Sequence, residues 1–262
     1  MINESIVINI INTAKQKAVR ALIRDFSEIQ YLRSSKKPLD QFVKYAFSRS
    51  EQLVYDALLE ARPTYSILSK AQGHKIGEDG KYRWLISSLT SHDNFAHGLP
   101  YFAISVALEA EGKIIIAVVD VIALGETYFA VKGSGAWVER NTNLTNDKMR
   151  LRVSNNNDLH SALILADQNT ATDLVKKRNT RLFGCAAVNM AYIAAGKADV
   201  FVGSEVHLCD VAAGLLLVGE AGGTVVNYIM DDKNIINKII ASNHEIFSKA
   251  EAEFSVLASS KL

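Results

Sequence analysis

The sequence predicts a mixed α/β protein, built as stacked layers of helices and sheets in two linked halves. Three observations favour this fold class. Apolar residues recur at helical spacing through the first 30 residues, strands follow one another closely from Trp84, and strands alternate with helices after residue 158. With 262 residues and 48% hydrophobic content, the chain is long enough to bury a large core as one compact unit.

The first half is predicted to be two helices followed by a meandering sheet. The first helix is indicated by apolar residues at Val7, Ile10, Ile11, Ala14, Ala18, Ala21 and Leu22. A second helix is expected from Asp40, as its N-cap, to about Ala61, because Pro63 ends it. A short strand (YSILS) and a polar loop (KAQGHKIGEDGKYR) come next. The later strands are predicted in WLISSL, YFAISVALEA, KIIIAVVDVIA and ETYFAVKGSGAWVER, the last with a Gly-Ser-Gly turn.

Residues 141–158 are polar and rich in asparagine, and they mark the expected boundary between halves at residues 1–145 and 146–262. In the second half, strands are predicted in SALILAD, RLF, DVFVG, TVVNYI and KIIAS. Helices are predicted in TATDLVKKR, in CAAVNMAYIAAG, from Asp210 to the Gly222–Gly223 pair, and in the tail from His244. Asp210 is expected to be an N-cap, with either a functional or a capping carboxylate.

Composition excludes some classes of protein. Lys and Arg number 29 against 28 Asp and Glu, so the net charge of +1 gives no global basic field for nucleic acid, although a local patch is compatible with it. Cys185 and Cys209 lie in apolar segments, which fits buried thiols in a reducing compartment. The N-terminus, MINESIVINIINTAK, resembles neither a secretory signal nor a membrane span. We therefore expect a cytoplasmic protein that does not enter a membrane.

The junction WLISSLTSHDNF, residues 84–95, is where a strand is expected to give way to a short helix, and such junctions often hold the chemistry of α/β enzymes. It offers Ser87, Ser88, Thr90, Ser91 and His92, followed by Asp93 as the one carboxylate. No zinc-type histidine pair, nucleophile elbow, CxxC, Walker A or GxGxxG motif is present.

Two bland interpretations apply to this junction. Asp93 and His97 are spaced for one helix face, and a cap with a surface histidine is more common there than a metal site. The serines have no visible His-Asp partners, so they are expected to finish a strand and cap a helix.

Four stretches of the chain resemble the inositol monophosphatase family, in a frame similar to its bacterial extragenic-suppressor branch. CDVAAGLLLVGEAGG resembles the family's C-terminal signature, in which Trp-Asp opens a helix. FGCAAVNMAYIAAGKADVF, KGSGAWVE and WLISSLTSHDNFAHGLPYFAISVAL resemble three further family segments, the last written Trp-Ile-Ile-Asp-Pro-Leu-Asp-Gly-Thr. The resemblance implies an αβαβα fold, a homodimer, and hydrolysis of phosphate esters with Mg²⁺ ions held by carboxylates.

The chain departs from the family at the metal ligands that the resemblance implies. The Glu-Glu pair falls on Lys70 and Ala71, the two aspartates of Asp-Pro-Leu-Asp on Ser87 and Thr90, and only Asp210 keeps its carboxylate. Magnesium prefers hard oxygen ligands, and an ammonium about 4 Å from a 2+ ion repels it by roughly 8 kcal/mol at an effective dielectric near 20. We therefore expect no bound magnesium and no other cofactor.

Other family positions have changed as well. The Gly-Thr pair that orients water and phosphate becomes Ser91 and His92, and an acidic residue of the second helix becomes Phe47. On the substrate side, a serine becomes Cys185 and the glutamate that contacts inositol becomes Gly203. Lys37 falls on a family lysine.

Three functions follow as hypotheses. The first is a non-catalytic binding or regulatory protein, for which the extragenic-suppressor relatives suggest a partner in RNA polymerase and transcription antitermination. The second is an active Mg-dependent inositol-1-phosphate or sugar phosphate phosphatase with a rebuilt site that uses His92, Asp93, His97 and Asp210. The third is a metal-free sensor of a phosphorylated small molecule, bound by backbone N–H groups at Ser91 to Asp93.

The sequence also predicts what replaces the metal. A carboxylate left alone in a desolvated cleft is costly, so Lys70 is expected to approach Asp210 and supply a fixed positive charge. The alternative is that Lys70 extends into solvent while Asp210 caps its own helix.

Overall fold

The computed structural model describes residues 3–34, 38–141, 146–167, 170, 178–230 and 233–255. Its helices and strands are α1 (Glu4–Arg33), α2 (Leu39–Ala61), β1 (Ser66–Ser69), β2 (Gly73–Lys75), β3 (Tyr82–Ser87), α3 (His92–His97), β4 (Ile104–Ala110), β5 (Lys113–Val121), the 3-10 helix η1 (Ile122–Leu124), β6 (Glu126–Val131), β7 (Gly135–Asn141), β8 (Asn146–Arg150), β9 (Ile164–Ala166), β10 (Thr180–Arg181), α5 (Ala186–Ala194), β11 (Val200–His207), α6 (Leu208–Glu220), β12 (Gly223–Met230), β13 (Ile235–Asn243) and α7 (His244–Ser255).

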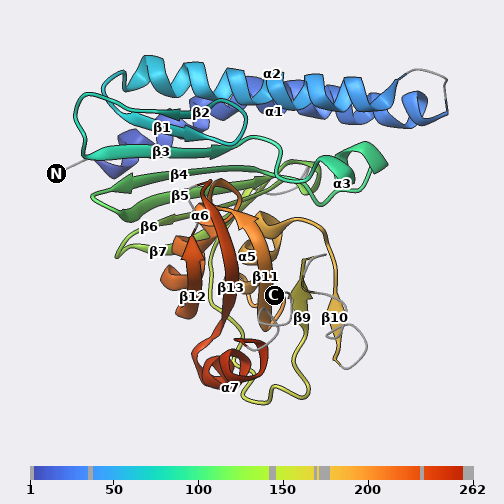
Figure 1. Cartoon of the computed structure of the whole chain (residues 1–262), viewed down its shortest axis with the longest axis vertical. Coiled ribbons are helices and arrows are strands. Elements are labelled where there is room, and N and C mark those ends of the chain that lie inside the picture. The colour runs from blue at the N-terminus through green and yellow to red at the C-terminus, as the bar shows by residue number, and fades with distance from the viewer. Residues whose placement is uncertain are drawn as a thin grey trace.

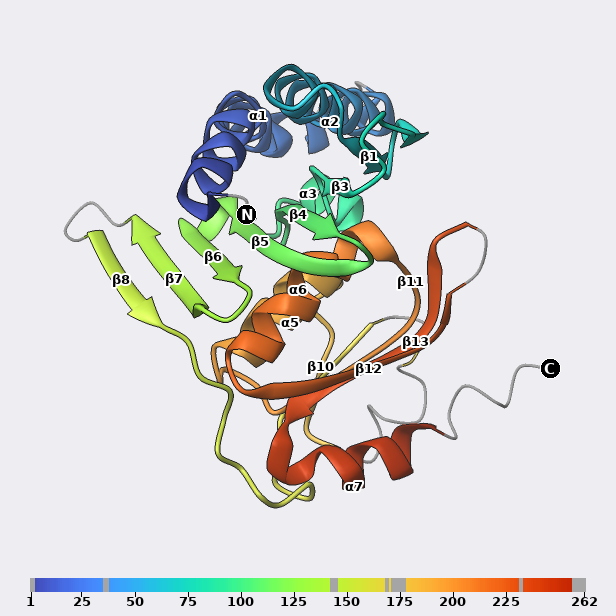
Figure 2. The same cartoon turned by 90° about the vertical axis from the view of Figure 1, so that its left-hand side faces the viewer.

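Five layers stack in the order helix, sheet, helix, sheet, helix (Figures 1 and 2). The α1–α2 pair covers one face of an eight-stranded sheet ordered β2-β1-β3-β4-β5-β6-β7-β8. Helices α5 and α6 lie between that sheet and a five-stranded sheet ordered β10-β9-β11-β13-β12. Helix α7 packs on the outer face of the second sheet. The predicted fold class is confirmed.

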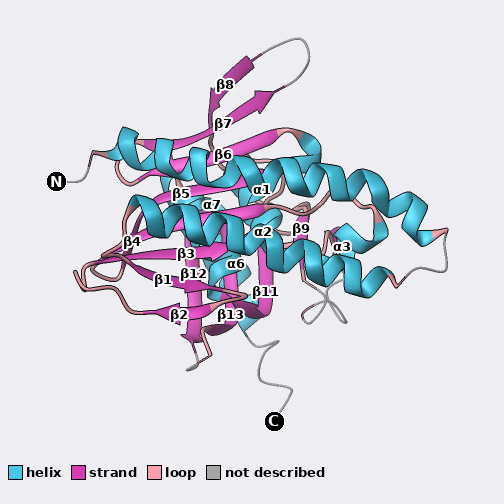
Figure 3. Cartoon of the chain, turned by 90° about the horizontal axis from the view of Figure 1, so that it is seen from above, coloured by secondary structure: helices cyan, strands magenta, loops and turns pink. Residues whose placement is uncertain are grey.

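Alternation along β3 shows how one strand serves two of these layers. Trp84 and Ile86 belong to the core under α1 and α2, whereas Leu85 belongs to the core around α5 and α6. Successive side chains of a strand point to opposite faces, so a sheet buried on both sides is apolar at every position. The central strands of the first sheet follow that pattern. Figure 3 shows α1 and α2 lying across one face of this sheet, and α6 contacts β3, β4 and β5 from the other face.

The structure adds two strands to those that the sequence predicts. β2 lies in the stretch expected to be a polar loop, where it pairs antiparallel with β1. β8 lies in the expected boundary segment and pairs with β7, so the first sheet includes residues 146–150, which the division of the chain had placed in the second half. The residues of both strands whose burial is described are exposed, and neither strand has the apolar alternation that identifies a strand.

Asp40 is not the N-cap of α2, because Pro38 occupies that position and Asp40 lies in the first turn, where a negative charge still favours the helix dipole. The helix expected in TATDLVKKR lies almost entirely outside the described residues. Among the described helices, none combines the length and the apolar content needed to cross a membrane.

Candidate functional site

The ends of β1 and β3 meet the start of α6 at a cavity of about 390 Å³. The first half of the chain contributes Lys70, Thr90, Ser91, Asp93 and Asn94 to its wall. The second half contributes Asp167, Gly184, Ala186, Ser204, Glu205, Val206, His207, Asp210 and Ile235. The cavity therefore lies between the two halves, and five of the residues singled out in the sequence line it: Lys70, Thr90, Ser91, Asp93 and Asp210.

The sequence predicts Asp210 as the N-cap of α6, but Asp210 lies in the first turn of that helix. The N-cap is His207, whose Nδ1 accepts a hydrogen bond from the Cys209 backbone N–H at 3.1 Å. This cap relieves Asp210 of capping, so its carboxylate points away from its own helix and toward the first half of the chain. The interpretation of Asp210 as a capping residue is therefore wrong.

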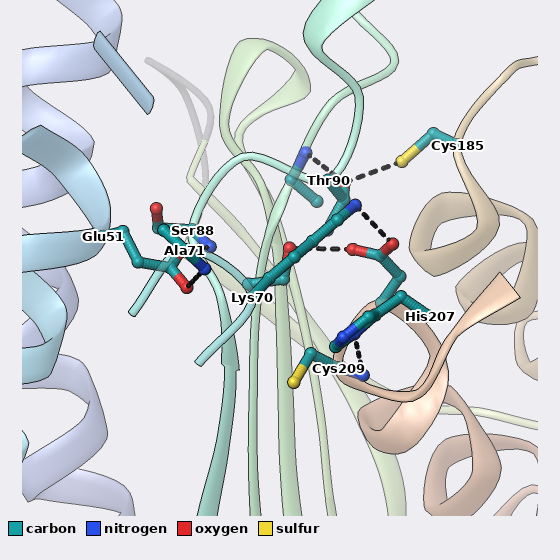
Figure 4. A network of polar contacts seen from close by, with 11 residues as sticks. Glu51, Lys70, Ala71, Ser88, Thr90, Cys185, His207 and Cys209 are labelled. Atoms are coloured by element: carbon teal, nitrogen blue, oxygen red, sulfur yellow. Dashed lines mark hydrogen bonds and ion pairs between the residues drawn. The ribbon is translucent and has the colours of Figure 1, made fainter. Parts of the chain in front are cut away.

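Two side chains of the first half, Lys70 and Ser87, bind the Asp210 carboxylate; Lys70 is labelled in Figure 4. The Lys70 Nζ donates to Oδ2 at 2.7 Å, and the Ser87 Oγ donates to Oδ1 at 2.8 Å. The side chains of Lys70 and Asp210 are 28% and 10% exposed, so water screens this ion pair only in part. The expected approach of Lys70 to Asp210 is confirmed, and the alternative of a solvent-exposed Lys70 is wrong.

Thr90 and Cys185 connect the two halves of the chain at a second point. The Thr90 Oγ1 and the Cys185 Sγ are hydrogen bonded at 2.9 Å, and Oγ1 also accepts from the Ala103 backbone N–H. Burial raises the pKa of the Cys185 thiol to about 11, which keeps it protonated near neutral pH. Because the thiolate is the nucleophilic form, this cysteine is a packing residue.

His92 and Phe47 meet in the structure, although the sequence places them in different segments. Their ring centroids are 4.2 Å apart, so the two positions that the family uses for an acid and a water-orienting threonine hold a pair of rings. The Nε2 atom of His92 is buried and has no hydrogen-bond partner among the described residues. Burial, followed by the charge of Lys70, lowers the pKa of His92, against smaller opposing effects of Asp210 and Asp93.

This pKa shift predicts a stability change with pH. The pKa of His92 is lower in the folded protein than the ordinary 6.5. Between these two pKa values His92 is therefore protonated in the unfolded chain and neutral in the folded chain. Stability should therefore fall as pH drops below about 6.5 and level off below the folded pKa, with a slope of at most about 1.4 kcal/mol per pH unit from this residue.

Urea unfolding between pH 7.5 and pH 5 measures that slope. His92→Phe keeps the ring contact with Phe47, replaces the unpaired nitrogen by carbon, and should flatten the slope. Substitution of the exposed His74 by Gln is the matched control and should leave it unchanged. An identical slope in His92→Phe and the unmodified chain would show that another group titrates.

The remaining predicted residues are not all brought together. His97 is exposed at the far end of α3, and it does not line the cavity. Gly203 also lies outside the cavity wall, since a Cβ there would meet Phe201 and Ile239 within 3 Å. Lys37 lies outside the described residues. The anion site expected at Ser91 to Asp93 stays a prediction, because α3 is a six-residue helix and the Ser91 Oγ already accepts from one of its amides.

Glu51, a fully buried carboxylate in the middle of α2, was not predicted to belong to the site. It accepts hydrogen bonds from the Ser69 Oγ, the Ala71 N–H and the Ser88 N–H. Figure 4 shows Glu51 beside Ala71 and Ser88. A signal existed, because Glu51 falls between Val43, Ala46, Val54 and Leu58 on the apolar face of α2, where a charged residue needs a partner. Asp167, Ser204, Glu205 and His207 of the cavity wall were missed as well.

The donor set around Asp210 does not fit a magnesium ion. Magnesium requires oxygen ligands with negative or strongly polar character, and carboxylates usually provide them. Here one Asp210 oxygen holds an ammonium and the other a hydroxyl, and Thr90 is occupied by Cys185 and Ala103. Among the described residues, no three side chains of His, Cys, Asp or Glu are grouped to hold a metal ion.

The class of protein follows from two features: five alternating layers, and a cavity between the ends of β1 and β3 and the first turn of α6. This chain is a member of the inositol monophosphatase family, whose model matches residues 3–258. The Cys209–Gly223 segment and the junction of residues 84–95, on which this expectation rested, both lie within the match.

Named relatives fall into two groups. An inositol-1-monophosphatase of Mesorhizobium japonicum is 35% identical over 259 residues, covering 94% of each chain. A Nus factor SuhB of Pasteurella multocida is 29% identical over 238 residues, covering 85% of each chain. Among solved structures, the extragenic suppressor protein suhB of Bartonella henselae superposes with a TM-score of 0.80 at 32% identity, covering 95% of this chain and 99% of that one.

Proposed function

We propose that this chain has lost the Mg-dependent phosphomonoesterase chemistry of its family and acts as a binding or regulatory protein. The observation that carries the proposal is the Lys70 ammonium on Asp210 at 2.7 Å. In two-metal hydrolysis the ions activate water and hold the phosphate oxygens. A lysine ammonium donates hydrogen bonds but does not coordinate and activate a water molecule as a metal ion does. Lys70 therefore supplies positive charge without the water activation that hydrolysis requires.

A second candidate, an active Mg-dependent phosphatase, is favoured by the relatives named inositol-1-monophosphatase. The residues proposed for a rebuilt site argue against it. His92 is packed on Phe47 with a lowered pKa, and Asp210 is engaged by Lys70 and Ser87. A hydrolase needs a general base within reach of a bound water, whereas His92 packs on a ring and both Asp210 oxygens already accept from other donors.

The cavity wall bears on the third candidate, a metal-free sensor of a phosphorylated molecule. Four carboxylates (Asp93, Asp167, Glu205 and Asp210) line it with Lys70 as the one ammonium among its described residues. Without a metal ion, a phosphate group would meet an excess of negative charge, because like charges repel most strongly where water is scarce. This charge balance ranks the sensor below the binding or regulatory role.

The experiment that decides between the first two candidates is a phosphatase assay. Purified protein is incubated with inositol-1-phosphate and several concentrations of magnesium, and phosphate release is followed, with the Mesorhizobium japonicum relative as the positive control. We expect no magnesium-dependent release from this chain. Turnover that depends on magnesium and disappears in Asp210→Asn would overturn the proposal.

The partner and the assembly belong to the same proposal. The relatives named Nus factor SuhB support a transcription partner, with RNA polymerase as the first to be tested by co-elution of the purified proteins. Homodimer assembly and a cytoplasmic location, which the sequence led us to expect, complete it. Sedimentation of the purified chain tests the dimer.

A further inference from the structure

Glu51 binds two separate segments of the chain, one at the end of β1 and one at the end of β3. Its Oε1 accepts from the Ser69 Oγ at 2.7 Å and from the Ala71 N–H at 3.3 Å. Its Oε2 accepts from the Ser88 N–H at 2.6 Å. The first segment follows β1 and the second follows β3, so one buried carboxylate of α2 binds the ends of two neighbouring strands.

The residues between these contacts are the two donors to Asp210. Lys70 lies between Ser69 and Ala71, and Ser87 directly precedes Ser88. In an extended chain, consecutive side chains point to opposite faces. Ser69 therefore reaches Glu51 on the α2 side, while Lys70 reaches Asp210 on the α6 side. Figure 4 shows Glu51 and Lys70 on the two sides of this segment.

We propose that Glu51 is a positioning residue, which fixes the backbone on both sides of Lys70 and beside Ser87 so that their donors meet the Asp210 carboxylate. The backbone of Lys70 is further held by its N–H, which donates to the Ile86 carbonyl at 3.1 Å. The Lys70 side chain has a flexible stem of four carbons, so the position of its ammonium depends on how firmly hydrogen bonds fix its backbone. This inference rests on the contacts alone and does not depend on whether the chain hydrolyses phosphate esters.

The chemistry of Glu51 suits this role. A carboxylate is an acceptor at both oxygens, and the three groups that face it are all donors. In Glu51→Gln one oxygen becomes an NH₂ group, which faces an N–H or an O–H donor and repels it. The substitution keeps the shape of the side chain and removes the hold on one of the two segments.

Chemical labelling of the Lys70 amine tests the proposal. A short pulse of an amine-reactive ester is followed by peptide mass spectrometry, with labelling of Lys70 normalised to the exposed Lys81. In Glu51→Gln, the Lys70 labelling rate should rise about tenfold, the change that the loss of one charge-assisted hydrogen bond produces. The same variant tests the structure separately through its melting temperature.

Asp25→Asn is the matched control. Asp25 is a buried carboxylate of α1 paired with Arg49 of α2. The variant therefore removes a buried charge from the same helix pair and leaves the residues that Glu51 binds unchanged. Lys70 labelling in Asp25→Asn should equal that of the unmodified chain. Equal labelling in Glu51→Gln and Asp25→Asn would overturn the proposal. If Glu51→Gln does not fold, Ser69→Ala decides, because it removes one donor to Glu51 and should give a smaller rise.

Discussion

Replacing Lys70 by Glu, and Ser87 and Thr90 each by Asp, is expected to create a magnesium ligand set around Asp210. The three positions belong to the segments that converge on this carboxylate, and each substitution adds an oxygen ligand of the kind that magnesium prefers. Exchanging the ammonium also removes a repulsion on the order of 8 kcal/mol for an ion about 4 Å away. Even a quarter of that value, about 2 kcal/mol, is roughly thirtyfold in affinity.

Calorimetry with magnesium chloride measures the affinity, and the melting temperature provides a second readout, since an ion that binds the folded state stabilises it. The triple variant should be less stable than the unmodified chain in chelator, because its carboxylates repel one another, and should gain stability as magnesium is added. Adding Asp210→Asn to the triple variant should abolish that gain. Equal magnesium affinity in the triple variant and the unmodified chain would contradict the assignment of these positions.

Lys70→Ala should destabilise the fold by about 2–3 kcal/mol, because it leaves the largely buried Asp210 carboxylate with the Ser87 hydroxyl and without its cation. The pair joins the loop after β1 to the first turn of α6, which are 140 residues apart in sequence. Its loss therefore removes a contact between the two halves of the chain. Urea unfolding followed by circular dichroism measures the change.

A double-mutant cycle separates the ion pair from the rest of the side chain. Lys70→Ala with Asp210→Asn should cost about 1–2 kcal/mol less than the sum of the single variants, since the second substitution no longer strands a charge. Lys81→Ala, which breaks an exposed pair with Glu111, is the control and should leave the unfolding curve where it was. Additive costs would mean that the two groups touch without mutual stabilisation.

Strong periodicity explains why most of the fold was predictable. The apolar positions of α1 and the continuous apolar runs of β4 and β5 identify their elements, because a buried face imposes a period on the sequence. β2 and β8 carry no such signal. Their described side chains are exposed, and they are strands only because β1 and β7 offer free edges beside them.

Part of the candidate site was predictable because a lysine replaces a carboxylate of the family at residue 70 while Asp210 is kept. Lys70 at a carboxylate position and the surviving Asp210 together predict their contact, since an isolated buried charge is costly. The cap by His207 was not predictable, because a ring nitrogen is an uncommon substitute for Ser, Thr, Asp or Asn at that position. Glu51 was missed because its partners are two backbone amides and a serine, which only the tertiary fold places around it.

The contact between Lys70 and Asp210 has a consequence for how the protein responds to its surroundings. A metal ion exchanges with the solution, so a site that depends on one is filled or emptied as the free ion concentration changes. An ammonium carried on the chain has no dissociation equilibrium of that kind, and its local concentration is set by covalent attachment. We therefore expect the contact between the two halves, and the outer surface that both of them form, to be the same in chelator and in magnesium.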